Sequence, residues 1–124
     1  MIKIACVGIL CADVIVEKVL KYPKLGFLEK VNSITMHSGG NAMTNAINLK
    51  KLGVNSAIIG MVGNDMFGNY LKECLDKQNV DIRGLKTSKK AQTSTSVLMV
   101  DNSGERSFFH CTGTNDEFSI NDID

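Results

Sequence analysis

Residues 38–53 read SGGNAMTNAINLKKLG, and residues 54–68 continue as VNSAIIGMVGNDMFG. In each stretch a glycine-marked turn leads into a segment with helical spacing of its apolar residues. A glycine pair such as Gly39-Gly40 lets the backbone approach a bound molecule closely, and a helix start offers unpaired N–H donors to it. The two stretches together predict a pocket for a small polar molecule at the edge of an α/β sheet.

Strands and helices alternate on both sides of this stretch. The expected strands are Ile2–Val7, Ser56–Val62 and Val80–Leu85, and the expected helices are Asn41–Leu52 and Met66–Gln78. Gly53 suits a C-terminal helix stop, and Asp65 suits an N-cap. This alternation predicts an α/β fold with a parallel sheet and right-handed crossovers.

Four further segments have strand character but do not fit this alternation. They are Val14–Leu20, Lys30–His37, Gln92–Val100 and Arg106–Thr112. The first two are separated by a break at residues 22–26, and residues 101–105 form a turn between the last two. We expect the first pair to form a hairpin-like unit outside the central sheet, so that the inserted strands make a second, smaller sheet. Ser119 suits the N-cap of a final helical turn.

Composition narrows the class of protein. The chain has 124 residues, 44% of them hydrophobic, which fits one soluble domain at most. The net charge is +1 with scattered lysines, which argues against nucleic-acid binding, and no apolar run is long enough for a membrane span. The first ten residues lack the pattern of a secretory signal. Four cysteines without a C-x-x-C pair argue against zinc and favour reduced thiols in a cytoplasmic protein.

The ordered motifs resemble those of the ribokinase-like, or phosphofructokinase B, carbohydrate kinase family. They are Gly8-x4-Asp13, Gly39-Gly40 with Leu52-Gly53, Gly60-x-Val62-Gly63-x-Asp65-x-x-Gly68, Thr93, Gly104-Glu105-Arg106 and Gly113-Thr114-Asn115. Each motif alone is weak, but their order and spacing along the whole chain match the family. The resemblance implies a three-layer, Rossmann-like α/β core with a mostly parallel sheet and a small β-sheet lid. Residues 1–124 would be the N-terminal part of that kinase domain, a truncated front portion with lid strands near 14–37 and 92–112.

The resemblance also implies an activity, cofactors and partners. Members of the family transfer the γ-phosphoryl group of ATP, with Mg²⁺, to a hydroxyl of a sugar or nucleoside. A homodimer through the lid sheet is implied as well, and a lid face for that contact would carry Ile34, Met36, Val97 and Met99. Hexose, pentose and nucleoside substrates are not distinguished by the sequence.

Six residues are candidates for substrate binding by this resemblance. Asp13 would accept hydrogen bonds from substrate hydroxyls, and the backbone of Gly39-Gly40 would lie against the substrate, with Asn41 and Thr44 as further contacts. His110 would touch a hydroxyl, or else pack against other lid strands or a dimer partner. Asp13 has the alternative of a turn or cap residue after the first strand. Thr44 stands where the family usually has a substrate-binding Asn, and it lacks the two groups of an amide.

The residues for the chemical step are not found in this sequence. The family's catalytic base is an aspartate in a Gly-Ala-Gly-Asp-like motif of the second half, and only Gly63-Asn64-Asp65 approaches it here, in a front-half context. No P-loop motif and no G-x-G-x-x-G after the first strand occur, which disfavours a Rossmann dinucleotide binder. We therefore expect the chain alone to be inactive. It is either the front portion of a kinase or a non-catalytic remnant that binds a ligand without a nucleotide site.

Overall fold

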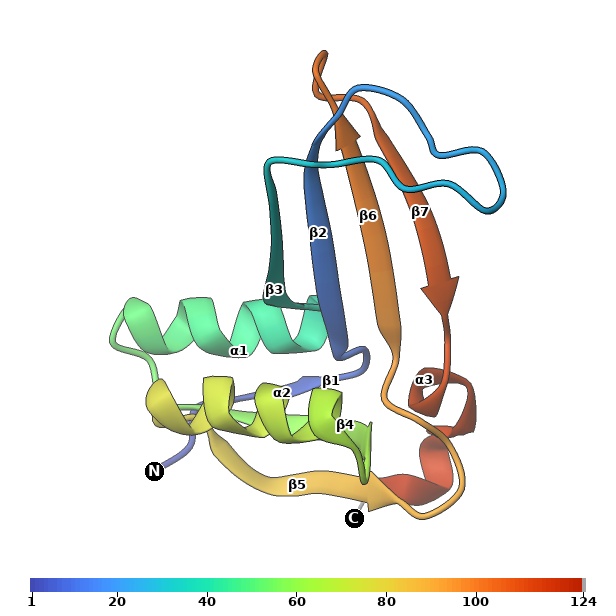
Figure 1. Ribbon diagram of the computed structural model, residues 1–124. Helices are drawn as coiled ribbons and strands as arrows, with labels where there is room; N and C mark the ends of the chain where they lie inside the picture. Colours follow the sequence, from blue (N-terminus) through green and yellow to red (C-terminus); the bar gives the residue numbers. More distant parts are fainter. Residues whose placement is uncertain (124) are drawn as a thin grey trace.

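A parallel sheet and two helices form the lower unit of the molecule, which we call the core (Figure 1). The computed structural model describes residues 1–123, so Asp124, the last residue of the predicted domain, lies outside the described residues. The core sheet has the strand order β1 (Ile4–Val7), β4 (Ser56–Gly63) and β5 (Asp81–Ser88), with every pair parallel. Helix α1 (Asn41–Lys51) leads into β4, and α2 (Met66–Lys77) connects β4 to β5; both helices cover one face of the sheet. The predicted α/β alternation is confirmed.

The buried side chains explain why the two helices pack on this sheet. Several residues of β4 and of both helices have no exposed surface, among them Met43, Ala46, Ile58, Leu71 and Leu75. The α2 residues recur at a spacing of four, so they form one apolar stripe. The hydroxyl of Ser56 donates to the carbonyl of Ala46 at 2.7 Å and ties β4 to α1.

Gly53 and Asp65 mark the end of α1 and the start of α2, as the sequence predicts. Gly53 has a φ of +81° just after α1, as a helix stop requires. Asp65 is the N-cap of α2, and its Oδ1 accepts from the N–H of Gly68 at 2.8 Å. Gly63 ends β4 without a positive φ, so its backbone conformation does not require a glycine. It is small because a Cβ there would lie 2.6 Å from the backbone nitrogen of Thr93.

A second sheet stands on the core, and we call it the lid (Figure 1). Its strand order is β3 (Ser33–Gly39), β2 (Cys11–Val19), β6 (Thr95–Asp101) and β7 (Arg106–Cys111). β2 pairs antiparallel with β3 and parallel with β6, and β6 pairs antiparallel with β7. The hairpin outside the central sheet is therefore confirmed, although its first strand begins at Cys11, three residues before the predicted start.

Short segments close the described chain beside the core. They are α3 (Thr114–Glu117) and a 3₁₀ turn, η1 (Ile120–Asp122), which Ser119 caps as predicted. The Asn115 amide donates to the carbonyl of Leu10 at 3.1 Å, and the Thr114 hydroxyl donates to that of Met61 at 3.1 Å. These bonds hold the return from the lid against the core strands.

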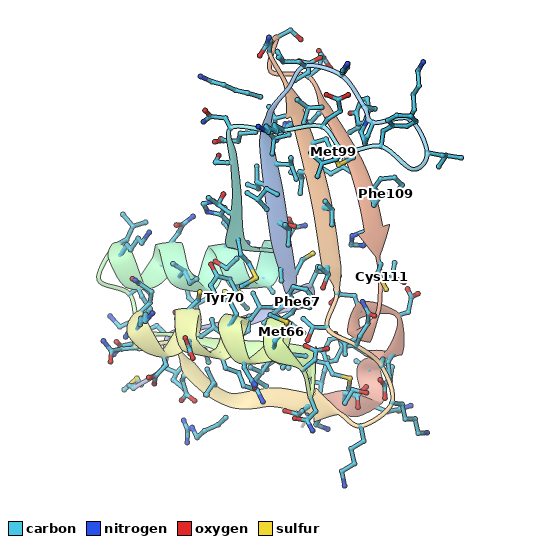
Figure 2. All side chains as sticks on the ribbon, viewed as in Figure 1. Met66, Phe67, Tyr70, Met99, Phe109 and Cys111 are labelled. Carbon is cyan, nitrogen blue, oxygen red and sulfur yellow. The ribbon has the colours of Figure 1, made fainter. Side chains whose placement is uncertain are left out.

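Helix α2 supports the foot of the lid. Phe67 and Tyr70 lie between α2 and the lower ends of the lid strands (Figure 2), and the Tyr70 hydroxyl donates to the carbonyl of Met36 at 2.9 Å. Burial, together with the neighbouring Cys74, raises the pKa of Tyr70 to about 12. Tyr70 thus stays a neutral donor at physiological pH.

Among the described residues, no helix has the length and apolarity to cross a membrane, and all four cysteines are free.

Candidate functional site

A row of four polar residues crosses one face of the lid. In the strand register, Asp13 pairs with His37 of β3 and with Ser96 of β6, and Ser96 pairs with His110 of β7. Register partners on neighbouring strands point to the same face of a sheet. We call His37, Asp13, Ser96 and His110 the polar row.

The opposite face of the lid is apolar. The neighbours of the polar row in each strand form a second row of register partners, which are Val14, Met36, Val97 and Phe109. Ala12 shares this face and is buried in the core cluster against which Phe67 and Tyr70 of α2 pack. The polar row therefore faces away from α2.

Hydrogen bonds hold both imidazoles of the polar row. Ser96 is buried, and its Oγ lies 2.8 Å from Nδ1 of His110. On the other flank, Oγ1 of Thr35 lies 3.0 Å from Nε2 of His37. Each exposed ring is thus fixed through one nitrogen, while the other nitrogen has no partner among the described residues.

A buried thiol lies beneath the row. Sγ of Cys11 donates to Oδ1 of Asp13 at 3.5 Å and lies 3.5 Å from Oγ of Ser96. Burial raises the pKa of the Cys11 thiol, against the effect of the hydrogen bond with Ser96. Cys11 therefore stays a protonated donor that helps to orient the Asp13 carboxylate.

The glycine pair makes room at the end of the row. A Cβ at Gly39 would collide with Oδ2 of Asp13, so only glycine leaves the carboxylate in its place. Gly40 has a φ of +91°, and a Cβ there would collide with the carbonyl of Ile9. The same Ile9 carbonyl accepts from the N–H of Ala42 at 3.2 Å. The pair thus brings the start of α1 directly beneath Asp13.

Asn41 and Thr44 occupy the first turns of α1. The N–H of Thr44 donates to the carbonyl of Gly40 at 2.9 Å, and its exposed side chain makes no hydrogen bond within residues 1–123. Asn41 borders a groove of about 480 Å³ between β1 and α1, which Asn45 and Asn48 also line. Both residues therefore lie at the foot of the lid, and the structure does not join them to the polar row by hydrogen bonds.

The arrangement refines the expectations from the sequence. Asp13 lies inside β2, so it is neither a turn residue nor a helix cap. His110 shares the lid face of Asp13, as does Phe108 one row further. Sequence reasoning missed His37, Ser96 and Cys11. Counting alternate residues from Asp13 would have found Cys11, but the other two depend on a register between strands far apart in sequence.

The donor set of the described residues does not form a metal centre. No group of three or more His, Cys, Asp or Glu side chains within residues 1–123 is placed to hold an ion. What the row offers is hydrogen bonding: one carboxylate acceptor, two imidazoles and a hydroxyl on one face. Such a set suits a polyhydroxylated ligand, because each hydroxyl both donates and accepts.

Comparisons with known proteins show what the chain is similar to. The pfkB family carbohydrate kinases match residues 1–123. A putative sugar kinase, PH1459 of Pyrococcus horikoshii, is 42% identical over 91 residues, which are 73% of this chain and 27% of that protein. A fructokinase of Salmonella typhimurium is 39% identical over 70 residues, which are 56% of this chain and 23% of that protein.

A solved structure gives the same architecture. The ribokinase of Arabidopsis thaliana, complexed with ribose and ATP, superposes with a TM-score of 0.83 at 25% identity, over 90% of this chain and 36% of that one. The parallel core with a β lid is thus the fold of the ribokinase-like kinases. The chain belongs to the pfkB family of carbohydrate kinases, and it spans about a quarter to two fifths of the length of the relatives it matches.

Proposed function

We propose that this chain supplies the substrate-binding part of a carbohydrate kinase, which transfers the γ-phosphoryl group of ATP to a hydroxyl of a sugar or nucleoside. The observation that carries the proposal is the Asp13 carboxylate, seated over Gly39 in a row of hydrogen-bonding side chains. In this proposal residues 1–124 are the N-terminal part of a larger kinase domain. Membership of the family supports the reaction type.

The roles of the site residues follow from their positions. Asp13 accepts hydrogen bonds from two substrate hydroxyls, since a carboxylate offers two oxygens. Gly39 and Gly40 let the substrate approach the backbone, and His110 covers it from the lid. Asn41 and Thr44 contact it from the start of α1, where unpaired N–H groups also point outward.

The phosphoryl-transfer step needs groups that we assign outside the described residues. These groups are the catalytic aspartate, the ATP site and the Mg²⁺ site, and we place them there because the family's Gly-Ala-Gly-Asp-like motif does not occur in this sequence. When bound, ATP with Mg²⁺ supplies the phosphoryl group and neutralises its charge. The work of this chain is to bind and orient the sugar and to exclude water over it.

Two related properties belong to the same proposal. The apolar lid face, with Met99 and Phe109 labelled in Figure 2, pairs with the same face of a second copy to give a homodimer. Phe109 and Ile34 leave 73% and 64% of their surface exposed, which fits a face that is covered in an assembly. Four free cysteines fit a protein that works in the reducing cytoplasm.

Titration of the ¹⁵N-labelled chain with D-fructose, D-ribose and adenosine, followed by NMR, tests the binding role. We expect amide shifts at Asp13, Gly39 and Gly40 for at least one compound, and loss of those shifts in Asp13→Asn. Glu17→Gln, an acidic residue on the same face of β2, is the matched control and should bind like the unchanged chain. Absence of shifts with all three compounds would contradict the proposal.

A second measurement separates a kinase portion from a ligand-binding module. The purified chain should show no ATP-dependent phosphorylation of these compounds, and detectable product would contradict our placement of the base. The intact mass of the protein in its native cell decides between the two. A mass of twice the 13.5 kDa of this chain or more supports the kinase, and a mass of 13.5 kDa supports the module.

A further inference from the structure

Resting on the proposed function, we propose that His110, positioned by Ser96, determines specificity by binding one hydroxyl of an uncharged polyol that Asp13 also holds. His110 would then be a contact residue, and Ser96 a positioning residue that acts through it. The proposal adds to the carboxylate a second anchor on a different strand of the lid.

A buried side chain holds the ring of His110. Ser96 is 8% exposed, and its Oγ lies 2.8 Å from Nδ1 of His110. The hydroxyl of Ser96 is itself fixed from below, where Sγ of Cys11 lies at 3.5 Å. A buried anchor of this kind fixes the orientation of an exposed ring. Nε2 of His110 remains, without a partner among the described residues, on the face that carries Asp13.

One lid strand separates Asp13 from His110 in the polar row. Ser96 lies on β6, directly between Asp13 on β2 and His110 on β7, so two strand spacings separate the carboxylate from the imidazole. Neighbouring strands lie about 4.8 Å apart, which gives roughly 10 Å between the two strands. A furanose or hexose with hydroxyls on opposite sides of its ring bridges such a gap between two side chains.

The charges on this face of the lid favour an uncharged ligand. Besides the imidazoles of His37 and His110, the lid strands present on this face two carboxylates, Asp13 and Glu17, and the guanidinium of Arg106. Arg106 lies four residues from His110 on β7, or about 13 Å at the rise of a strand. A phosphate in the row would meet the Asp13 carboxylate without a nearby arginine fork to offset it. The face therefore selects an uncharged polyol over a phosphorylated one.

The experiment measures dissociation constants for D-fructose and D-fructose 6-phosphate with the ¹⁵N-labelled chain and its variants. We expect His110→Phe to weaken D-fructose binding about 5- to 10-fold, as the loss of one hydrogen bond predicts. Ser96→Ala should weaken it about 2- to 5-fold, and the double variant should match His110→Phe, because the two residues act as one unit. The phosphorylated sugar should bind more weakly than D-fructose.

A spectroscopic signal separates positioning from a merely structural effect. Ser96→Ala should change the ¹⁵N shifts of the His110 ring, while Cys111→Ser, on the adjacent exposed residue of the opposite face, should change neither these shifts nor binding. If Asp13→Asn abolishes binding and the His110 and Ser96 variants bind normally, this inference fails and the proposed function stands. If the unchanged chain binds no sugar, both fail. Equal affinity for the two sugars would also overturn the preference for an uncharged ligand.

Discussion

The core and the lid bury their side chains to very different degrees. In the core, Ile58, Leu71 and Leu75 have no exposed surface. In the lid, the large apolar residues Phe108 and Phe109 leave 56% and 73% of theirs exposed. Both units are regular sheets, so hydrogen bonding does not distinguish them. The difference is that helices cover one face of the core sheet, whereas helix α2 reaches only the foot of the lid.

This contrast separates stability from recognition. The core side chains contribute to the free energy of folding, because burial of apolar surface stabilises by about 25 cal/mol per Å². The exposed lid side chains contribute little to folding, so their identity is free to serve contacts with other molecules. Substitutions in the core should accordingly change the free energy of unfolding, and substitutions in the lid should change binding to other molecules.

The largest effect is expected in the core. Leu71→Ala removes a fully buried side chain of α2 and should lower the free energy of unfolding by about 2–5 kcal/mol. Ile34→Ala, at a 64% exposed position of the lid, should lower it by less than about 0.5 kcal/mol. Urea denaturation followed by circular dichroism measures both. Equal losses for the two variants would end the distinction between core and lid.

The next effect is expected at the junction of the two units. Both carboxylate oxygens of Asp65 are used: Oδ1 accepts from Gly68 N–H and from the Thr93 hydroxyl, and Oδ2 accepts from Thr93 N–H, all at 2.7–2.8 Å. Asp65→Ala removes the cap of α2 and leaves buried Thr93 groups unpaired. The free energy of unfolding should fall by about 1–3 kcal/mol. Asp76→Ala, an exposed residue of the same helix, is the control and should change it by less than about 0.5 kcal/mol.

The contribution of Asp65 should depend on pH. Burial alone would raise the Asp65 pKa, but the hydrogen bonds from Thr93 and Gly68 outweigh it, and the pKa lies below its usual value. A carboxyl whose pKa is lower in the folded state stabilises the protein above its unfolded pKa of about 4. The stability advantage over Asp65→Ala should therefore be full at pH 7 and decline as the pH falls from about 4 through the folded pKa. A constant difference down to pH 2 would contradict this origin.

The core was predictable from the sequence because its signals are local. The helical spacing of the apolar residues predicted both helices, and Asp65 and Gly53 predicted helix ends. Each of these predictions depends on residues that lie within one helical turn or one strand of each other in the sequence. The need for a glycine at position 63 is not local in this sense, because it comes from Thr93, which is 30 residues away.

The site was only partly predictable because it depends on strand register. Asp13 and Gly39 were found by their resemblance to family motifs, and His110 by its place on a lid strand. Ser96 belongs to the row only because β6 pairs in parallel with β2 in one particular register. A shift by one residue would turn Ser96 to the apolar face. The register of two strands so far apart in the sequence cannot be predicted from composition or periodicity.

A smaller effect on stability, with a clear effect on binding, is expected at Gly39. An alanine Cβ would collide with Oδ2 of Asp13, so the carboxylate must turn away. Because the side chain of Asp13 is partly exposed, this movement should cost about 1 kcal/mol or less in unfolding free energy. Binding of D-fructose, measured by NMR titration, should weaken about 10-fold. Unchanged affinity in Gly39→Ala would contradict the role of Gly39 in placing the carboxylate.

The smallest effect on stability is expected on the apolar lid face. Phe109→Asp replaces a side chain that is 73% exposed, so the free energy of unfolding should change by less than about 0.5 kcal/mol. If this face joins two copies, as we propose, the same substitution should convert a dimer into a monomer in light scattering after gel filtration. A carboxylate buried at a two-fold interface meets its own copy and carries a desolvation cost. Leu52 lies at the end of α1, far from the apolar lid face in the chain, and is 79% exposed, so Leu52→Asp should leave the dimer intact. A monomeric unchanged chain, or a dimeric Phe109→Asp variant, would show that the exposed lid residues serve another contact.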